Sequence, residues 1–130
     1  MIKNILIVGF GGAAGSILRY LTSAVMARHD NYNNYLGIFP WATFTVNILG
    51  CILIGLFIGL SGRSEILSPE LKLLLITGFC GGYTTFSTFS SENLFLFSNG
   101  FYGILTAYVL LSIILGFFGV LLGTALAKLI

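Results

Sequence analysis

The sequence predicts an all-α membrane protein with four transmembrane helices. Of its 130 residues, 57% are hydrophobic and only 8% are charged, and the mean hydropathy is +1.02. A soluble domain is usually about 25% charged. The chain is long enough for four helices of about 20 residues, the length that crosses a bilayer, with short loops between them. We expect a single integral membrane domain over residues 1–130, with spans at about 5–26, 42–60, 69–97 and 101–128.

The composition also excludes several classes of protein. A net charge of +2 without a basic stripe is too small to indicate a nucleic-acid partner. Cys51 and Cys80 both fall inside predicted spans, where they are expected to be small buried residues and not a disulfide pair. The single histidine, His29, has no second histidine and no cysteine near it, so a metal site there is not expected.

The first span carries a face of small residues and one charge. The pairs Gly11/Gly15 and Gly12/Ser16 fit the small-xxx-small pattern that lets two helix backbones approach closely. Arg19 lies two to three turns before the end of the span. Its long side chain could reach toward the interface, attract an anion into a vestibule, or pair with Glu92. The sequence leaves these alternatives open.

A polar loop ends at Pro40, and Trp41 then suits an interfacial anchor at the start of the second span. The conspicuous polar residue of this span is Asn47. An asparagine inside the bilayer usually bonds a neighbouring helix, but its amide N–H groups could instead face an anion. Before the third span, Ser68 and Pro69 are typical of an N-cap and a first helical residue.

The third span contains an expected break. Glycines cost roughly 1 kcal/mol each in a helix interior relative to alanine, so the helix should break at Gly81-Gly82 and restart near Thr84 or Thr85. Six of the eight residues at 84–91 carry hydroxyls. A break at membrane depth is tolerated where protein or a wet cavity satisfies the freed backbone groups. Its carbonyls suit a cation such as Na⁺ and its N–H groups suit an anion.

Aromatic and hydroxyl side chains alternate after the break. Phe86 and Phe89 are spaced i, i+3 and should share a face, either as ordinary packing or with their electropositive ring edges lining an anion path. Thr85 and Thr88 have the same spacing and could add hydroxyl donors. Glu92 is the one carboxylate deep in a span, and such residues are functional by default. No proton chemistry is assigned to it.

Charge placement predicts an orientation. Four spans put both termini and the second loop on the same side of the membrane. That side carries Lys3, Arg63, Lys72 and Lys128, whereas the other carries Arg28. The positive-inside rule then places the termini in the cytoplasm. A bias of this size favours a single orientation.

The run Gly-Gly-x-Thr-Thr-Phe-Ser-Thr-Phe-Ser-x-Glu at residues 81–92 resembles the signature of the fluoride channel family, known as Fluc or CrcB. The resemblance extends to Gly11-Gly12-x-x-Gly15-x-x-x-Arg19 and to the segment around Asn47, so that it covers nearly the whole chain. Members are small four-helix membrane proteins that work as antiparallel, dual-topology homodimers. The resemblance therefore implies a homodimer that inserts in both orientations.

The resemblance also implies the roles of particular residues. In the family the break holds a structural Na⁺ at the dimer centre through backbone carbonyls, which correspond to those of Gly81 and Thr84. The pore phenylalanines correspond to Phe86 and Phe89, and their polar partner to Asn47. A hydroxyl track on the fourth span corresponds to Tyr108 and Ser112, which lie at i, i+4. That track does not continue, because Gly116 and Val120 stand where further hydroxyls would be expected.

The function implied is passive fluoride export across the plasma membrane of a prokaryote, conferring fluoride resistance. HF enters the cell and dissociates, and a cell-negative potential drives the trapped anion outward with about 2.3 kcal/mol per 100 mV. The runner-up is a small proton-coupled multidrug-type exporter, which needs a carboxylate in the first span, where Arg19 is the only charge. An enzyme is not expected, because no nucleophile–base pair or metal constellation is present. No organic cofactor is expected.

Overall fold

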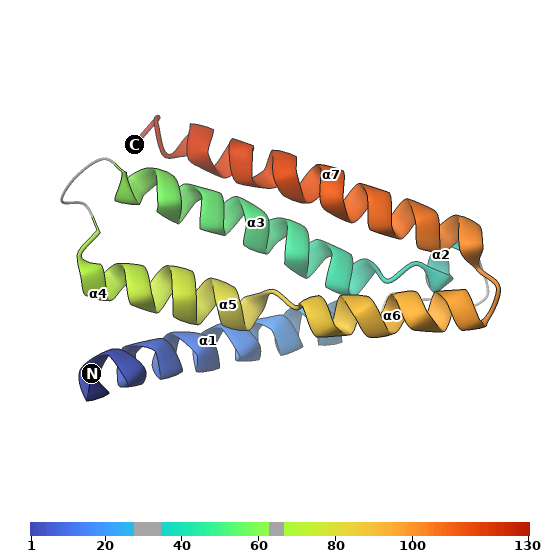
Figure 1. Ribbon diagram of the computed structural model, residues 1–130, viewed down its shortest axis with the longest axis horizontal. Coiled ribbons are helices and arrows are strands. Elements are labelled where there is room, and N and C mark those ends of the chain that lie inside the picture. The colour runs from blue at the N-terminus through green and yellow to red at the C-terminus, as the bar shows by residue number, and fades with distance from the viewer. Residues whose placement is uncertain (28–34, 63–66) are drawn as a thin grey trace.

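Four long helical segments lie side by side in the computed structural model, and the third is interrupted near its middle (Figure 1). The structure describes residues 1–27, 35–62 and 67–130; the expectations for Arg28, His29 and Arg63 fall outside these ranges. All secondary structure in the described ranges is helical. The complete segments are α1 (Ile2–Ala27), α3 (Trp41–Ser61) and α7 (Tyr102–Leu126).

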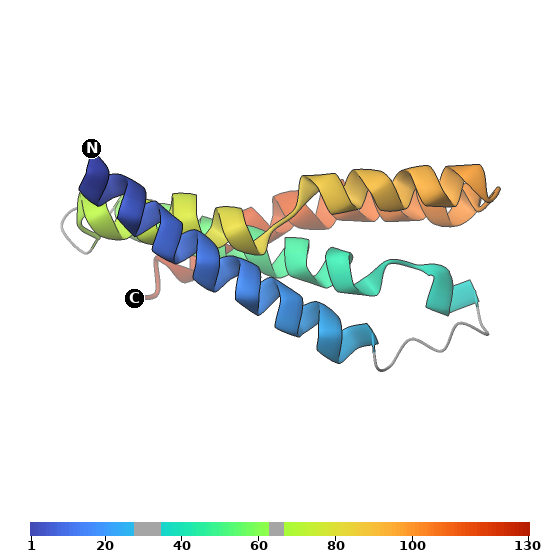
Figure 2. The same cartoon turned by 90° about the horizontal axis from the view of Figure 1, so that it is seen from below.

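The third segment is assembled from four shorter pieces, and a short helix that was not predicted precedes α3. The pieces are α4 (Pro69–Lys72), the π-helix η1 (Leu73–Cys80), α5 (Gly81–Tyr83) and α6 (Phe86–Ser98). The additional helix is α2 (Tyr35–Ile38). In Figure 2 the third segment bends away from α1 after α5, so that α6 runs beside α7.

The chain is an integral membrane protein. By length and apolar composition α1, α3 and α7 are each able to cross a bilayer. The broken third segment runs along the same axis, and the two termini lie at the same end of the molecule (Figure 1). This arrangement is the one expected for four spans.

The helix boundaries follow the predicted signals. The Ser68 hydroxyl accepts a hydrogen bond from the Leu71 N–H, with Pro69 as the first helical residue. After α6 the chain turns through Gly100, whose φ of +76° is favourable for glycine.

An ion pair joins α1 and α4, where the Lys3 ammonium and the Glu70 carboxylate are 3.1 Å apart. That pair is exposed and contributes little to stability.

Glycines bring α1 into backbone contact with the third segment, as the small-xxx-small pattern predicts. A Cβ atom at Gly15 would collide with the Phe79 carbonyl oxygen, and one at Gly11 with the Leu74 carbonyl oxygen. Both glycines are buried. Because lipid tails are as apolar as the helices, such close van der Waals contact stabilises helix association in a membrane.

The first extended residue of the break, Thr84, lies two residues after the predicted glycine pair. The helix continues through Gly81 and Gly82 and ends at Tyr83, and the extended residues are Thr84 (φ −78°, ψ 160°) and Thr85 (φ −150°, ψ 119°). The prediction that the helix restarts near Thr84 or Thr85 is confirmed, whereas the helix does not stop at the glycine pair itself. Gly82 instead permits close packing, because a Cβ there would collide with the Gly12 carbonyl oxygen. The packing gain offsets the helix penalty of glycine.

The eight π-helical residues of η1 were also not predicted. A π-helix of more than one turn is rare, and π-helical turns are frequent near functional sites. This one is separated from the break by the short helix α5 and packs against the glycine face of α1. The π-helix is therefore part of the close contact between the third segment and α1.

Glycines also explain the contact between α3 and α7. A Cβ at Gly55 would collide with the Val120 carbonyl oxygen, and one at Gly116 would lie 3.5 Å from the Cys51 sulfur. Gly116 and Val120, where further hydroxyls were expected, thus lie where α3 and α7 touch. Cys51 and Cys80 are both free thiols, as predicted.

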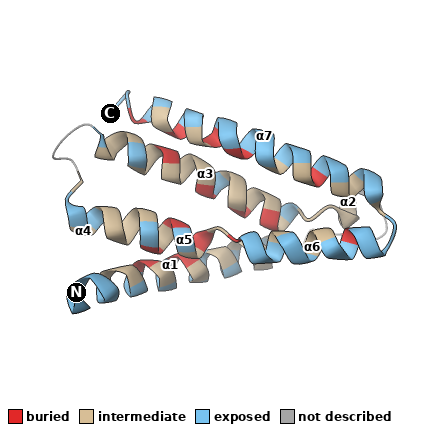
Figure 3. Ribbon diagram, viewed as in Figure 1, coloured by how far each residue is buried: buried red, intermediate tan, exposed pale blue. Residues whose placement is uncertain are grey.

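Few residues are buried, and most of each helix is exposed or half-buried (Figure 3). The largest fully buried side chains are Tyr108, Leu96, Val46 and Cys80. Many large apolar side chains are exposed instead, including Phe10, Ile113 and Phe117. This distribution suits a bilayer, where no water opposes an apolar exterior.

The glycine contacts can be tested on α1 with a matched pair of variants. Gly15→Ala should lower the free energy of unfolding by about 1–3 kcal/mol, since the new methyl group meets rigid backbone. Gly9→Ala is the control, because nothing lies within 4 Å of a Cβ there. Thermal unfolding in detergent measures both. Equal midpoints for the two variants would contradict the packing account.

Candidate ion pathway at the helix break

Asn47 holds the break through both ends of its side-chain amide. Its Nδ2 donates to the Thr85 carbonyl oxygen at 3.1 Å, and its Oδ1 accepts from the Thr85 N–H at 2.8 Å. The side chain thus replaces the hydrogen bonds that Thr85 would make in a continuous helix. The expectation that Asn47 bonds a neighbouring helix is confirmed.

The break releases backbone carbonyls on its N-terminal side. In an unbroken helix the Thr85 N–H would bond the Gly81 carbonyl, but here it bonds Asn47. Among the described residues no hydrogen bond is made to the Gly81 oxygen. The next carbonyl, that of Gly82, accepts a long bond of 3.4 Å from the Ser16 hydroxyl. Gly81 itself is exposed.

Arg19 bonds a carbonyl on the extended part of the break. Its Nη1 donates to the Thr84 oxygen at 3.2 Å. It forms no ion pair with Glu92; the ion pair found within the described ranges is that between Lys3 and Glu70. The Arg19 side chain lines a cavity that most of its other lining residues furnish with hydroxyl groups.

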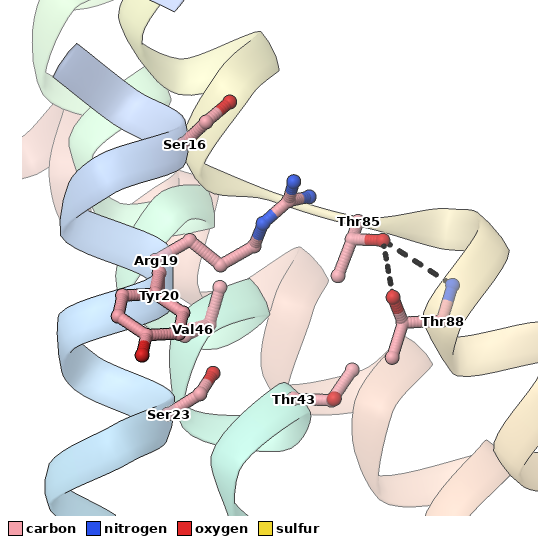
Figure 4. A pocket seen from close by; sticks show the side chains of 8 residues that line it. All are labelled: Ser16, Arg19, Tyr20, Ser23, Thr43, Val46, Thr85 and Thr88. Carbon is pink, nitrogen blue, oxygen red and sulfur yellow. Dashed lines mark hydrogen bonds between the residues drawn. The ribbon is translucent and has the colours of Figure 1, made fainter. Parts of the chain in front are cut away.

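That cavity measures about 300 Å³ and lies between α1, α3 and the break (Figure 4). In Figure 4 the Arg19 side chain extends from α1 toward the extended segment that contains Thr85. Hydroxyl groups dominate the rest of the lining, which comprises Ser16, Tyr20, Ser23, Thr43, Val46, Thr85 and Thr88. A water molecule takes about 30 Å³ of liquid volume, so the cavity can hold an ion together with part of its hydration shell.

Thr85 starts α6 as its N-cap. Its hydroxyl oxygen accepts from the Thr88 N–H at 3.2 Å and donates to the Thr88 hydroxyl at 3.0 Å (Figure 4). Thr85 is buried, whereas Thr88 is exposed and lines the cavity. The partial positive charge of a helix N-terminus therefore lies beside the Arg19 guanidinium.

Glu92 clamps three helices together. Its Oε1 accepts from the Thr43 hydroxyl of α3 at 2.7 Å, and its Oε2 accepts from the Tyr108 hydroxyl of α7 at 2.7 Å. Tyr108, expected to offer a hydroxyl to the pathway, is fully buried and donates its proton to Glu92. Charge-assisted bonds of this length are among the stronger ones in proteins.

Phe86 and Phe89 of α6 differ in their exposure. Their ring centroids are 6.0 Å apart, so they share a face as predicted. Phe86 is 80% exposed, whereas Phe89 packs on the Tyr108 ring at a centroid distance of 4.9 Å. One turn along α7, the Ser112 hydroxyl is buried without a hydrogen-bond partner among the described residues. Unpaired buried hydroxyls are uncommon and are available to bind a ligand or water.

Several lining residues were missed by sequence reasoning. Thr43 was not singled out, although its i, i+4 spacing from Asn47 places the two on one face of α3. On α1, Ser16, Tyr20 and Ser23 share a face with Arg19 at helical spacing. A stripe of polar residues on an apolar helix indicates a polar surface facing the protein interior, and it could have identified these lining residues.

Comparison with known proteins identifies the family. The profile of the family described as CrcB-like protein, Camphor Resistance (CrcB), matches residues 6–124. The chain belongs to the CrcB family.

Curated relatives match almost the whole chain. A protein of Bacteroides fragilis is 48% identical over 126 residues, which is 97% of each chain. One of Azobacteroides pseudotrichonymphae is 45% identical over 128 residues, or 98% of each, and one of Flavobacterium psychrophilum is 46% identical over 126 residues. Each is named a fluoride-specific ion channel FluC. The family thus consists of ion channels and not enzymes, as predicted.

The role of Asn47 can be separated from that of a generic polar residue. Asn47→Leu should unpair both backbone groups of Thr85, at a cost of about 1–3 kcal/mol for each buried group left unsatisfied. Asn47→Asp keeps an acceptor for the Thr85 N–H and should lose less stability than Asn47→Leu. Hydrogen exchange at the Thr85 amide and thermal unfolding measure the two effects.

Asn93→Leu is the control for this pair, because the Asn93 amide donates within its own helix, to the Phe89 carbonyl at 2.9 Å. Slow exchange at Thr85 in Asn47→Leu, equal to the unmodified protein, would show that the break does not depend on Asn47.

Proposed function

We propose that this protein is a fluoride-selective channel that lets cytoplasmic fluoride leave the cell passively. The observation that carries the proposal is the polar cavity at the break, in which Arg19 and the N-terminus of α6 supply positive charge. Membership of the CrcB family and relatives named as fluoride-specific channels support it.

The chemistry of the cavity suits a small, strongly hydrated anion. Hydroxyl and guanidinium donors can replace water around the ion as it leaves the aqueous phase. Beyond the break, the ring edges of Phe86 and Phe89 carry partial positive charge. The unpaired hydroxyl of Ser112 offers one further donor on α7. The proposed pathway thus comprises Asn47, Thr85, Phe86, Thr88, Phe89, Tyr108 and Ser112.

Passive conduction fits the position of the charges better than proton-coupled export. The span α1 contains no carboxylate, and Arg19 is its charge next to the cavity. Both oxygens of Glu92 accept hydrogen bonds from hydroxyl groups. With the cell interior negative, the membrane potential alone drives an anion outward.

The carbonyls of Gly81 and Thr84 fit the structural sodium ion that we propose as part of the function. Unwound backbone carbonyls at a helix break are the ligands by which broken membrane helices hold Na⁺. No hydrogen bond to the Gly81 oxygen is made among the described residues, which leaves it open to a cation, whereas the Thr84 oxygen accepts a bond from Arg19 that a cation would have to displace. The Na⁺ would neutralise the negative end of the first half-helix.

A second copy of the chain would complete the site. Gly81 and Phe86 are both exposed in a single chain, and two carbonyls are too few to surround a cation. A homodimer would double the carbonyl ligands and cover these residues. We propose an antiparallel homodimer in the plasma membrane of a prokaryote, although the lysine and arginine bias favours one orientation.

Ion efflux from liposomes tests the function. Purified protein should release fluoride when a K⁺ shunt is added, measured with a fluoride electrode, and should retain chloride under the same conditions. Chloride release at a similar rate would contradict selectivity. Absence of fluoride release by folded, dimeric protein would contradict the channel and favour the exporter.

The phenylalanines provide a site-specific prediction. Phe86→Ile or Phe89→Ile should slow fluoride efflux at least tenfold, which corresponds to about 1.4 kcal/mol in the barrier, because the ring edges are lost. Phe117→Ile is the control, as Phe117 is also a well-exposed phenylalanine but belongs to α7 and not to α6. Efflux at the unmodified rate in both α6 variants would remove the rings from the pathway.

A further inference from the structure

Arg19 and the proposed sodium ion share a ligand. The guanidinium of Arg19 donates to the Thr84 carbonyl oxygen at 3.2 Å, and that oxygen is one of the two proposed Na⁺ ligands. The other ligand, the Gly81 oxygen, has no such donor in the described part of the chain. The two carbonyls therefore differ in how available they are to a cation.

We propose that Arg19 sets the sodium affinity of the break by competing with Na⁺ for the Thr84 carbonyl oxygen. This inference rests on the sodium site proposed above. It assigns Arg19 a role in cation binding in addition to its place beside the anion cavity.

The hydrogen-bonding surroundings of Arg19 support competition between Arg19 and Na⁺ for the Thr84 carbonyl oxygen. A guanidinium has five N–H donors and no acceptor, so it must find oxygens. The nearby hydroxyls of Ser16, Ser23 and Thr88 are neutral. The carboxylate of Glu92 is already bonded to Thr43 and Tyr108. The acceptor that Arg19 uses is the Thr84 carbonyl.

Binding of the Arg19 guanidinium and Na⁺ to the same carbonyl oxygen at the same time is electrostatically unfavourable. A guanidinium and a sodium ion on one oxygen repel each other, and the low dielectric of a membrane interior screens that repulsion weakly. Binding of Na⁺ must therefore weaken or displace the Arg19 bond. Without Na⁺, the same bond satisfies a carbonyl that the break would otherwise leave unpaired, and so stabilises the empty site.

The test measures thermal unfolding of the purified full chain at increasing Na⁺, with N-methylglucamine chloride holding the ionic strength constant. Arg19→Gln should reach half of its sodium-induced stabilisation at a concentration about tenfold lower than the unmodified protein, since one charge-assisted hydrogen bond no longer opposes binding. Without Na⁺, the variant should unfold at a lower temperature than the unmodified protein.

Two further variants make the result specific. Lys128→Gln removes the same charge beyond the end of α7 and should leave the half-saturating Na⁺ concentration unchanged. Arg19→Lys keeps the charge but loses the planar fork and should fall between the unmodified protein and Arg19→Gln. If Arg19→Gln does not fold, an unchanged half-saturation in Arg19→Lys overturns the inference.

The outcomes separate this inference from the proposed function. A half-saturating concentration in Arg19→Gln equal to or above that of the unmodified protein overturns the competition while leaving the sodium site intact. Stability independent of Na⁺ in every variant overturns the sodium site, and the inference with it. Fluoride efflux remains a separate readout of the channel itself.

Discussion

Two hydrogen bonds from one asparagine organise the centre of this protein. By bonding both the N–H and the carbonyl of Thr85, Asn47 gives the backbone an alternative to the helix at the one place where the helix stops. The Gly81 oxygen is left without its helical donor as a direct result, and Thr85 is free to cap α6. The proposed cation ligands and the positive helix end both follow from this arrangement.

Glycine contacts and the hydrogen bonds of Glu92 hold the four helical segments together around the break. Glycine contacts bring α1 against η1 and α5, and α3 against α7. Glu92 ties α6 to α3 and α7 through Thr43 and Tyr108. In a bilayer these interactions matter more than apolar burial, since lipid offers the exposed side chains an equally apolar surrounding.

The features that depend on local sequence were predicted well. Hydropathy predicted α1, α3 and α7, which are long and apolar enough to cross a bilayer. The start of α4 follows from Ser68-Pro69, and the close approach of α1 follows from the spacing of Gly11 and Gly15. The family resemblance, carried by residues 81–92, is confirmed by the profile match. Each of these signals lies within a short stretch of chain.

The features that depend on contacts between distant residues were not predicted. The break falls at Thr84-Thr85 because Asn47, on another helix, bonds Thr85, and the glycine penalty alone could not locate it. The acceptor of Arg19 and the donors to Glu92 likewise come from other helices. The π-helix has no residue signature in the sequence. Its position against the glycine face of α1 became evident only with the packing.

The central claim is that fluoride moves through this protein passively and selectively. The reversal potential in a planar bilayer tests it most directly, with a tenfold fluoride gradient, symmetric chloride and equal pH on both sides. For a channel selective for a monovalent anion, the account predicts about 59 mV in magnitude, unchanged when a pH gradient is added. A reversal potential near zero, or one that follows the pH gradient, would contradict it.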